Sequence, residues 1–246
     1  MNICVCVKQV PDTAEIRIDP ETNTLIRSGV PSIVNPFDLY ALETAFRLRE
    51  EKGGKIWIIS MGPAQAEKAV RACLEMGADE GVLISGRAFG GSDTFSTGYI
   101  LSAGIRAIEE AENIKFDLIL CGRQAIDGDT AQVGPELAEH LGISQITMAQ
   151  RGYDLITTEL PAVITVLKSD IPPRCPTLKT KLVARKKTVV VLDETKMKGI
   201  VLEHCGLKGS PTRVISTYVP TAKKNGYFIE NKDGQAAVEE LMDRLQ

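Results

Sequence analysis

Short apolar runs alternate with segments of helical periodicity from the N-terminus to about residue 145. The apolar runs, with two later ones, predict buried strands at residues 2–10, 55–61, 81–85, 116–121, 159–168 and 188–192. Apolar residues that recur every three or four positions predict helices that begin at Asn35, Gly62, Asp93 and near Thr130. Strands that alternate with helices imply crossover connections, and these build a parallel sheet with helices on both faces. The pattern therefore predicts an α/β fold with a doubly wound parallel sheet.

Two further segments lie outside this alternation. Residues 15–28 alternate on both sides of a Pro-Glu-Thr-Asn turn and predict an exposed hairpin. From about residue 193 the chain is polar and rich in turns until a short amphipathic helix predicted at 236–245. Because such a tail cannot bury a core of its own, we predict one domain over residues 1–190. Residues 191–246 would form a C-terminal extension that lies along this domain or along a partner.

The composition fits a soluble globular protein and excludes several classes of function. Of the 246 residues, 43% are apolar and 25% are charged, and the net charge of −3 argues against nucleic-acid binding. No apolar run approaches the roughly 18–20 residues of a membrane-spanning helix, and no signal-peptide pattern is seen. We therefore expect no membrane insertion and a cytoplasmic location. Six scattered cysteines without a Cys-x-x-Cys pair, and only two histidines, predict neither a zinc site nor a histidine-based triad.

The loop after the strand at 116–121 is the strongest candidate site. Residues 122–135 (GRQAIDGDTAQVGP) lead into a helix that begins near Thr130 or Gly134. Ligands bind beyond the carboxyl ends of parallel strands, and the unpaired amides of a helix N-terminus suit a phosphate or pyrophosphate. Acidic side chains here would face ribose hydroxyls or loop amides. The alternative is a simple turn in which Asp129 or Thr130 caps the helix.

A second candidate loop, residues 90–97 (GGSDTFST), also leads from a strand into a helix. Its glycines allow a ligand to approach the backbone closely, and its hydroxyl groups can donate hydrogen bonds to phosphate oxygens. The alternative is that Asp93 is only the N-cap of a helix with a Ser/Thr-rich first turn. The chain contains neither the G-x-G-x-x-G of a Rossmann site nor the G-x-x-x-x-G-K-[ST] of a Walker loop.

A basic stretch, residues 179–187 (KTKLVARKK), is interrupted by Leu182 and preceded by Leu178. An exposed leucine within a basic rim suits docking to a partner, with electrostatic steering; the alternative is a solvated charged face. No paired carboxylates, activated serine or thiolate indicate acid–base or nucleophilic catalysis. The residues alone therefore predict a nucleotide-binding α/β domain with a tail suited to a partner.

Several longer motifs together match one known family. They are Val-Lys-Gln-Val-Pro-Asp at 7–12, Asn-Pro-Phe-Asp at 35–38, Ser-Met-Gly-Pro at 60–63, the loop at 93–98, the loop at 122–135 and Pro-Arg-Cys-Pro-Thr-Leu at 173–178. Over nearly the whole chain they resemble the β subunit of electron transfer flavoproteins. The resemblance implies an α/β domain of the adenine-nucleotide-binding type. It also implies that residues at about 170–187 are the recognition loop for acyl-CoA dehydrogenases.

The resemblance further implies a heterodimer with an electron transfer flavoprotein α subunit, on which the C-terminal arm packs. Ordinary β subunits hold AMP as a structural ligand, whereas the electron-bifurcating kind holds FAD in an overlapping site. The Val-Lys-Gln-Val-Pro-Asp start and the Gly-Asp-Thr-Ala-Gln-Val-Gly-Pro ending resemble the bifurcating kind. That FAD takes hydride from NADH and passes one electron to ferredoxin or flavodoxin. The other electron goes through the α-subunit FAD to an acyl-CoA dehydrogenase, so the resemblance implies that the protein is a redox carrier.

The AMP-binding kind is the first alternative to this interpretation. The second alternative is a stand-alone ATP- or AMP-binding protein.

The family's cofactor-binding positions, matched residue by residue, imply three groups of residues here. The first group would lie at the adenosine end and beside the second strand, and consists of Cys6, Val7, Lys8, Asn35, Asp38, Met61 and Gly62. The second group would surround the pyrophosphate and ribose, and consists of Asp93, Thr94, Ser96, Thr97, Asp129, Thr130, Gln132, Val133 and Gly134. The third group would border the nucleotide, and consists of Gly122, Arg123, Gln124, Ala125 and Ile126. The charge of Arg123 would favour a reduced, anionic flavin, and Leu178 would be the docking anchor.

The chain departs from the family at one edge of the sheet. The family has an additional hairpin between the strand near 146–148 and the strand at 159–168. Residues 147–160 are short for such a hairpin. The sequence leaves open whether the hairpin is truly deleted.

Overall fold

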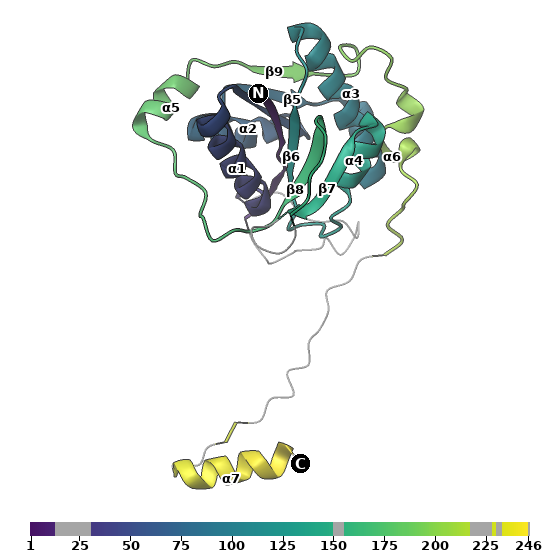
Figure 1. Cartoon of the computed structure of the whole chain (residues 1–246). Coiled ribbons are helices and arrows are strands. Elements are labelled where there is room, and N and C mark those ends of the chain that lie inside the picture. The colour runs from purple at the N-terminus through teal and green to yellow at the C-terminus, as the bar shows by residue number, and fades with distance from the viewer. Residues whose placement is uncertain (13–30, 150–154, 217–227, 230–232, 246) are drawn as a thin grey trace. The chain divides into compact units, whose positions relative to one another are not determined.

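The main sheet of the structure has seven strands, and the six apolar runs of the sequence each contribute one of them (Figure 1). The computed structural model describes residues 1–12, 31–149, 155–216, 228–229 and 233–245. The strands of the sheet are β1 (Asn2–Cys6), β4 (Lys55–Met61), β5 (Glu80–Ile84), β6 (Leu118–Gly122), β7 (Ser144–Ala149), β8 (Ala162–Val166) and β9 (Val189–Leu192). Their order is β7-β8-β6-β1-β4-β5-β9, and all six neighbouring pairs are parallel.

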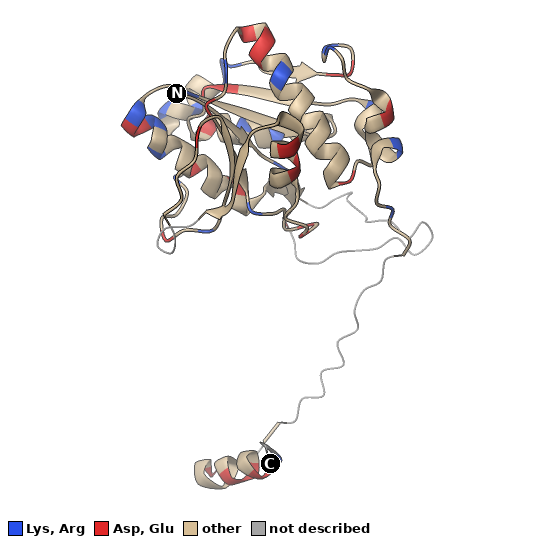
Figure 2. Cartoon of the chain, turned by 45° about the vertical axis from the view of Figure 1, so that its right-hand side comes forward, with Lys and Arg blue, Asp and Glu red and all other residues tan. Residues whose placement is uncertain are grey.

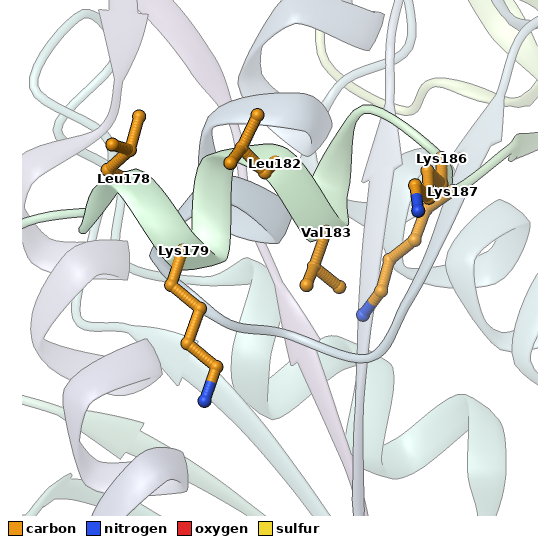
Figure 3. Close-up of a pocket in the computed structure, with 6 residues that line it drawn as sticks. All are labelled: Leu178, Lys179, Leu182, Val183, Lys186 and Lys187. Carbon is orange, nitrogen blue, oxygen red and sulfur yellow. The ribbon is translucent and has the colours of Figure 1, made fainter.

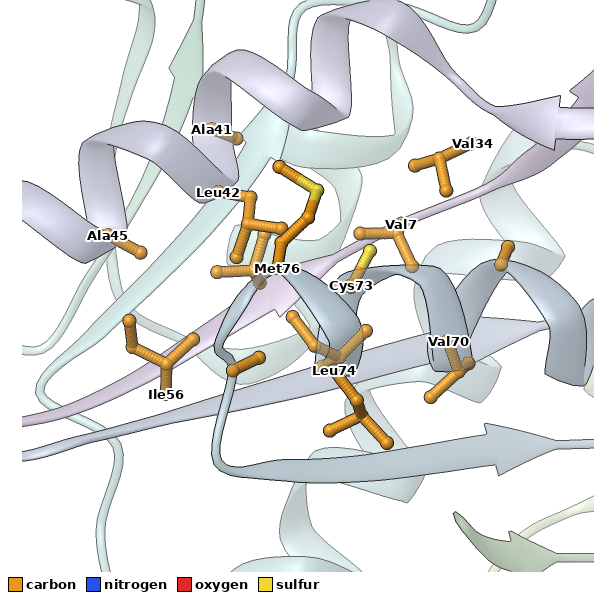
Figure 4. Close-up of a cluster of buried hydrophobic side chains, with 14 of the residues drawn as sticks. Val7, Val34, Ala41, Leu42, Ala45, Ile56, Val70, Cys73, Leu74 and Met76 are labelled. Carbon is orange, nitrogen blue, oxygen red and sulfur yellow. The ribbon is translucent and has the colours of Figure 1, made fainter. Parts of the chain in front are cut away.

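Helices cover both faces of this sheet. The helices α1 (Pro36–Lys52) and α2 (Glu67–Met76) lie on one face, and α3 (Thr94–Glu112) and α4 (Val133–Leu141) lie on the other (Figure 1). Each face has its own apolar core, because successive residues of a strand point to opposite sides. The first core contains Leu42 and Leu74 (Figure 4), and the second contains Ile100 and Leu137. The predicted doubly wound parallel sheet is confirmed.

The strand order creates a crevice beside β1. The next two strands along the sheet, β4 and β5, lie on one side of β1, whereas β6 lies on the other. The helices that follow β1 and β6, α1 and α4, cover opposite faces. Ligands of open α/β sheets bind at such a reversal, beyond the carboxyl ends of the strands. The loops that leave β1 and β6 are therefore the place to look for a site.

The predicted strand at 2–10 is wrong at its second half. The strand β1 ends at Cys6, and β2 (Gln9–Pro11) pairs antiparallel with β3 (Ser32–Val34) in a separate sheet. Two hydrogen bonds explain the break, because the amide of Lys8 donates to Asp38 and the carbonyl of Lys8 accepts from the amide of Asn35. These bonds direct the backbone of Lys8 to the start of α1 and away from the sheet.

The other predicted boundaries shift in smaller ways. The helix predicted from Gly62 begins with a 3-10 turn, η1 (Ala64–Ala66), before α2. The hairpin predicted at 15–28 lies outside the described residues. Within the described residues 155–160 there is no strand between β7 and β8.

The chain after β8 contains an unpredicted helix, α5 (Leu178–Ala184). After β9, the short elements η3 (Leu202–His204) and α6 (Gly206–Gly209) belong to the same compact unit as the sheet, which also contains η2 (Arg87–Phe89). The amphipathic helix predicted near the C-terminus is α7 (Gly234–Leu245), and it belongs to a second unit. Its side chains Val238, Leu241 and Met242 are exposed.

Candidate functional site

A buried polar cluster joins the ends of β1 and β6 to the start of α1. Asn35 is fully buried, and its side-chain Nδ2 donates to Asp38 Oδ1 at 2.9 Å and to Gln124 O at 2.8 Å. Its Oδ1 accepts from the amide of Ile126 at 3.2 Å. Asn35 is the N-cap residue of α1, but its side chain makes no capping bond and instead holds the loop after β6. Asn35 therefore fixes the position of the loop after β6, which forms part of the candidate site.

Asp38 completes this cluster. Its Oδ2 accepts from the amide of Lys8 at 2.7 Å, so it connects the loop after β1 to the same helix start. Burial raises the pKa of Asp38 to about 7, and hydrogen bonds from Asn35, Lys8 and Gly122 oppose the rise. Because only 6% of Asp38 is exposed, it too acts through the loops that it fixes.

Gly122 allows β6 to approach α1 closely. A Cβ atom at position 122 would lie 2.3 Å from Asp38 Oδ1 and 2.6 Å from the backbone of Phe37 and Asp38. Such distances are too short for any side chain, so the identity of this residue is dictated by packing. At Gly128, in the same loop, no atom lies within 4 Å of a Cβ position.

Replacement of Gly122 by alanine is therefore expected to lower the free energy of unfolding by about 1–3 kcal/mol, because backbone must move to admit the methyl group. Gly128→Ala is the matched control, and its effect should stay within about 0.5 kcal/mol. Chemical denaturation of both variants measures the difference. Equal effects at the two positions would contradict the close approach of β6 to α1.

The loop between β6 and α4 has an unusual backbone. Asp129 and Ala131 are in the left-handed region, with φ of 59° and 58°. Non-glycine residues rarely adopt this conformation, and those that do are concentrated at functional sites. The acidic side chains of the loop have partners: Asp127 pairs with Lys8 Nζ at 2.7 Å, and Asp129 accepts a hydrogen bond from the Gln124 side chain.

The start of α4 has no side-chain cap. The helix begins at Val133, and its N-cap residue, Gln132, makes no side-chain capping bond. Capping of this helix by Asp129 or Thr130, the alternative considered from the sequence, is therefore wrong. Among the described residues, no hydrogen-bond acceptor is recorded for the amides of residues 130–134. Uncapped amides and alternating backbone conformations together favour anion binding.

The start of α3 differs, because a side chain already occupies it. Asp93 is the N-cap, and its Oδ1 accepts from the amide of Ser96 at 3.0 Å. Its Oδ2 accepts from the amide of Thr212 at 3.0 Å and from its hydroxyl at 2.8 Å. Burial raises the pKa of Asp93, but these hydrogen bonds outweigh burial and lower it overall. The alternative reading of Asp93 as a helix cap is thus confirmed, and of the two helix starts that of α4 is the uncapped one.

Thr94 connects the two helix starts. Its Oγ1 lies 3.2 Å from Gln132 Oε1 and 3.2 Å from Glu136 Oε1. The other carboxylate oxygen of Glu136 is buried and has no hydrogen-bond partner within the described structure, and the same is true of Arg123 Nε. Burial raises the pKa of Glu136, to which the charge of Asp93 adds, while the hydrogen bond from Thr94 opposes it. Glu136 was not among the candidate residues; its signal was an acid in the first turn of the helix.

The remaining candidate residues divide between the crevice and its surroundings. Cys6 and Val7 are buried at the end of β1, and Gly62, after β4, donates its amide to Ile84 O at 3.0 Å. Ser96 is fully buried, and its hydroxyl donates to His204 O at 3.0 Å, so it holds the C-terminal segment. The structure thus brings the loops after β1, β4 and β6 to one edge of the sheet.

The proposed docking residue lies on a separate surface. Leu178, the first residue of α5, is 76% exposed, and Leu182 and Val183 are exposed beside it. A hollow of about 680 Å³ is lined by Leu178, Lys179, Leu182, Val183, Lys186 and Lys187. Figure 3 shows these six side chains on and after α5. We call these six residues the docking surface. Elsewhere basic and acidic residues are interspersed over the helices around the sheet (Figure 2).

Neither a metal centre nor a membrane-spanning helix is found in the described part of the chain. No group of three or more histidine, cysteine or acidic side chains is placed to hold a metal ion there. None of the described helices has both the length and the apolar character to span a membrane.

Comparison with known proteins agrees with this architecture. An electron transfer flavoprotein domain matches residues 22–151. The electron transfer flavoprotein subunit beta of Thermoanaerobacterium thermosaccharolyticum is 45% identical, over 100% of this chain and 98% of the relative. The caffeyl-CoA reductase-Etf complex subunit CarD of Acetobacterium woodii is 40% identical, and the acryloyl-CoA reductase electron transfer subunit gamma of Anaerotignum propionicum is 42% identical; both matches cover 100% of this chain and 98% of the relative.

The first of these alignments runs over 262 positions, more than the 246 residues of this chain, so that relative has residues that this chain lacks. Its coverage nevertheless leaves almost nothing of either protein unmatched. Fold, motifs and full-length similarity agree: the chain belongs to the β-subunit family of electron transfer flavoproteins, and its role is in electron transfer.

Proposed function

We propose that this chain is the FAD-binding β subunit of an electron-bifurcating electron transfer flavoprotein. The observation that supports nucleotide binding is the run of uncapped amides at residues 130–134, after the carboxyl end of β6. Such a run fits the pyrophosphate of a dinucleotide, because several unpaired amide donors follow one another at the positive end of α4. The motif that surrounds these amides resembles the FAD-binding kind of β subunit.

Several residues are placed to hold FAD in this crevice. The amides of residues 130–134 would bind its pyrophosphate, and Thr94 and Gln132 lie beside them. The unpartnered Nε of Arg123 and the free carboxylate oxygen of Glu136 are further hydrogen-bonding groups that a ligand would satisfy. The positive charge of Arg123 would favour the anionic form of a reduced flavin. Bound FAD supplies the hydride and single-electron chemistry, while the protein binds and orients it.

The same amides also fit the single phosphate of AMP, the ligand of ordinary β subunits. The geometry of the described residues favours neither nucleotide over the other. The resemblance of residues 7–12 and 122–135 to the bifurcating kind is what favours FAD. The nucleotide content of the purified protein therefore distinguishes the two, as set out below.

Two surfaces with exposed apolar side chains support the proposed protein partners. We propose that the exposed residues of α7 and the C-terminal extension, residues 191–246, pack on an electron transfer flavoprotein α subunit. The docking surface would bind an acyl-CoA dehydrogenase, and two of the relatives are named for reductases of CoA thioesters. NADH would be the electron donor, ferredoxin or flavodoxin the low-potential acceptor, and the cytoplasm the location.

An anaerobic titration of the co-expressed α/β pair with NADH tests this function. The flavin absorbance of the β subunit should bleach as NADH is added, because its FAD receives the hydride. An unchanged β-flavin spectrum at excess NADH would contradict the proposal. The chain expressed alone should retain nucleotide poorly; a stable homodimer that cleaves ATP would instead identify a stand-alone nucleotide-binding protein.

A further inference from the structure

Arg174 joins the segment before α5 to the middle of α1. Its Nε and Nη2 donate to the two carboxylate oxygens of Glu43 at 2.9 and 3.0 Å, which is a bidentate pair. Its backbone amide donates to Glu43 Oε2 at 3.0 Å, and its Nη1 donates to Glu50 at 2.6 Å. One residue thus makes four hydrogen bonds to a helix that lies more than a hundred positions earlier in the chain.

The burial of Glu43 and the ring of Phe46 strengthen the contact between Arg174 and Glu43. The Glu43 side chain is only 7% exposed, and the guanidinium of Arg174 lies over the buried ring of Phe46, 4.5 Å from its centre. Burial raises the pKa of Glu43, but the hydrogen bonds from Arg174 outweigh it and lower the pKa overall. Exposed ion pairs contribute little to stability, whereas bidentate and stacked arginine pairs fix geometry as well as charge.

The far end of the same segment is fixed on α2. Thr177 and Thr180 form a capping box that begins α5, and Ala184 is buried at its end. Lys181 Nζ lies 3.8 Å from the carboxylate of Glu75 on α2. The segment is therefore held before and after Leu178, while Leu178 itself is exposed.

We propose that Arg174 is a positioning residue for partner docking, which holds the docking surface in its binding-competent conformation. This inference rests on the proposed docking of a dehydrogenase to Leu178. A segment that is ordered before binding loses less conformational entropy when the partner docks, and its affinity is correspondingly higher. Arg174 need not touch the partner for this effect, because it acts through the position of α5.

Hydrogen exchange of the α/β pair tests the positioning without a partner. Arg174→Met should raise amide exchange in residues 177–185 about tenfold and leave the strands β1, β4 and β6 unchanged. Arg174→Lys keeps the charge beside Glu43 but loses the bidentate geometry, so it should give an intermediate increase even if the methionine variant folds poorly. Arg185→Met removes the same charge from an exposed side chain that forms no ion pair within the described structure, and should leave amide exchange in residues 177–183 unchanged. Unchanged exchange in both Arg174 variants would overturn the proposal.

A double-mutant cycle tests the consequence for docking. The readout is kcat/KM for a purified acyl-CoA dehydrogenase that the wild-type pair reduces. Arg174→Met should lower it about tenfold in the wild-type background and less than twofold in the Leu178→Ala background, because both changes act on one contact. An equal loss in both backgrounds would show a general structural effect and overturn the inference. If Leu178→Ala itself has no effect, the docking function fails, and the exchange measurement still decides the role of Arg174.

Discussion

Replacement of Gln132 by glutamate is expected to lower the affinity of the α/β pair for FAD about 100-fold. The two side chains have almost the same shape, so the main change is a negative charge at the uncapped start of α4. A charge about 5 Å from a phosphate, at an effective dielectric constant of about 20, costs about 3 kcal/mol. That energy corresponds to roughly two orders of magnitude in the dissociation constant.

Gln132→Met is the matched control, because it keeps the length of the side chain without adding charge. Its affinity for FAD should remain within about tenfold of the wild-type value, since only the hydrogen bond with Thr94 is lost. Equilibrium titration of deflavinated protein with FAD measures all three forms, and thermal denaturation without nucleotide checks the fold. Equal affinities for the wild-type and Gln132→Glu forms would exclude the start of α4 as the pyrophosphate site.

Replacement of Leu178 by alanine is expected to lower kcat/KM for an acyl-CoA dehydrogenase by about 30-fold or more. A side chain that is largely exposed in the free protein gains most from burial in a partner, and such anchors contribute about 2 kcal/mol or more. Stability should be unaffected, because Leu178 is not part of the core. NADH oxidation in the absence of the dehydrogenase should also be unaffected, since the docking surface is separate from the nucleotide crevice.

The control for this substitution is Leu155→Ala, which removes the same atoms from a fully exposed leucine outside the docking surface. It should leave kcat/KM unchanged. If Leu178→Ala behaves like Leu155→Ala, the docking surface does not bind the dehydrogenase.

The fold was largely predictable from the sequence because its strands and helices have clear periodicities. The buried strands and the amphipathic α2 and α4 each carry a pattern that depends only on local spacing. The break after Cys6 was not predictable in this way. The apolar pattern continues through Val7 and Val10, and the strand ends because Asp38 and Asn35, about thirty positions later, bind the backbone of Lys8.

The candidate site was predictable in its location but not in its details. The glycine-containing loop after a buried strand indicated the crevice, and its motif indicated the family. Only the structure shows that the start of α4 is uncapped, and that Asp93, which caps α3 through the nearby amide of Ser96, also binds Thr212, 119 positions away. Similarly, the sequence marks Arg174 as part of a recognition segment, whereas its contact with Glu43 arises from the way α1 packs.

The most direct test of the central claim is the nucleotide content of the co-expressed α/β pair, released by denaturation and separated by chromatography. The account predicts two molecules of FAD per heterodimer. One FAD with one AMP would show that the chain is an ordinary β subunit. One FAD with no second nucleotide would contradict the binding site at the start of α4.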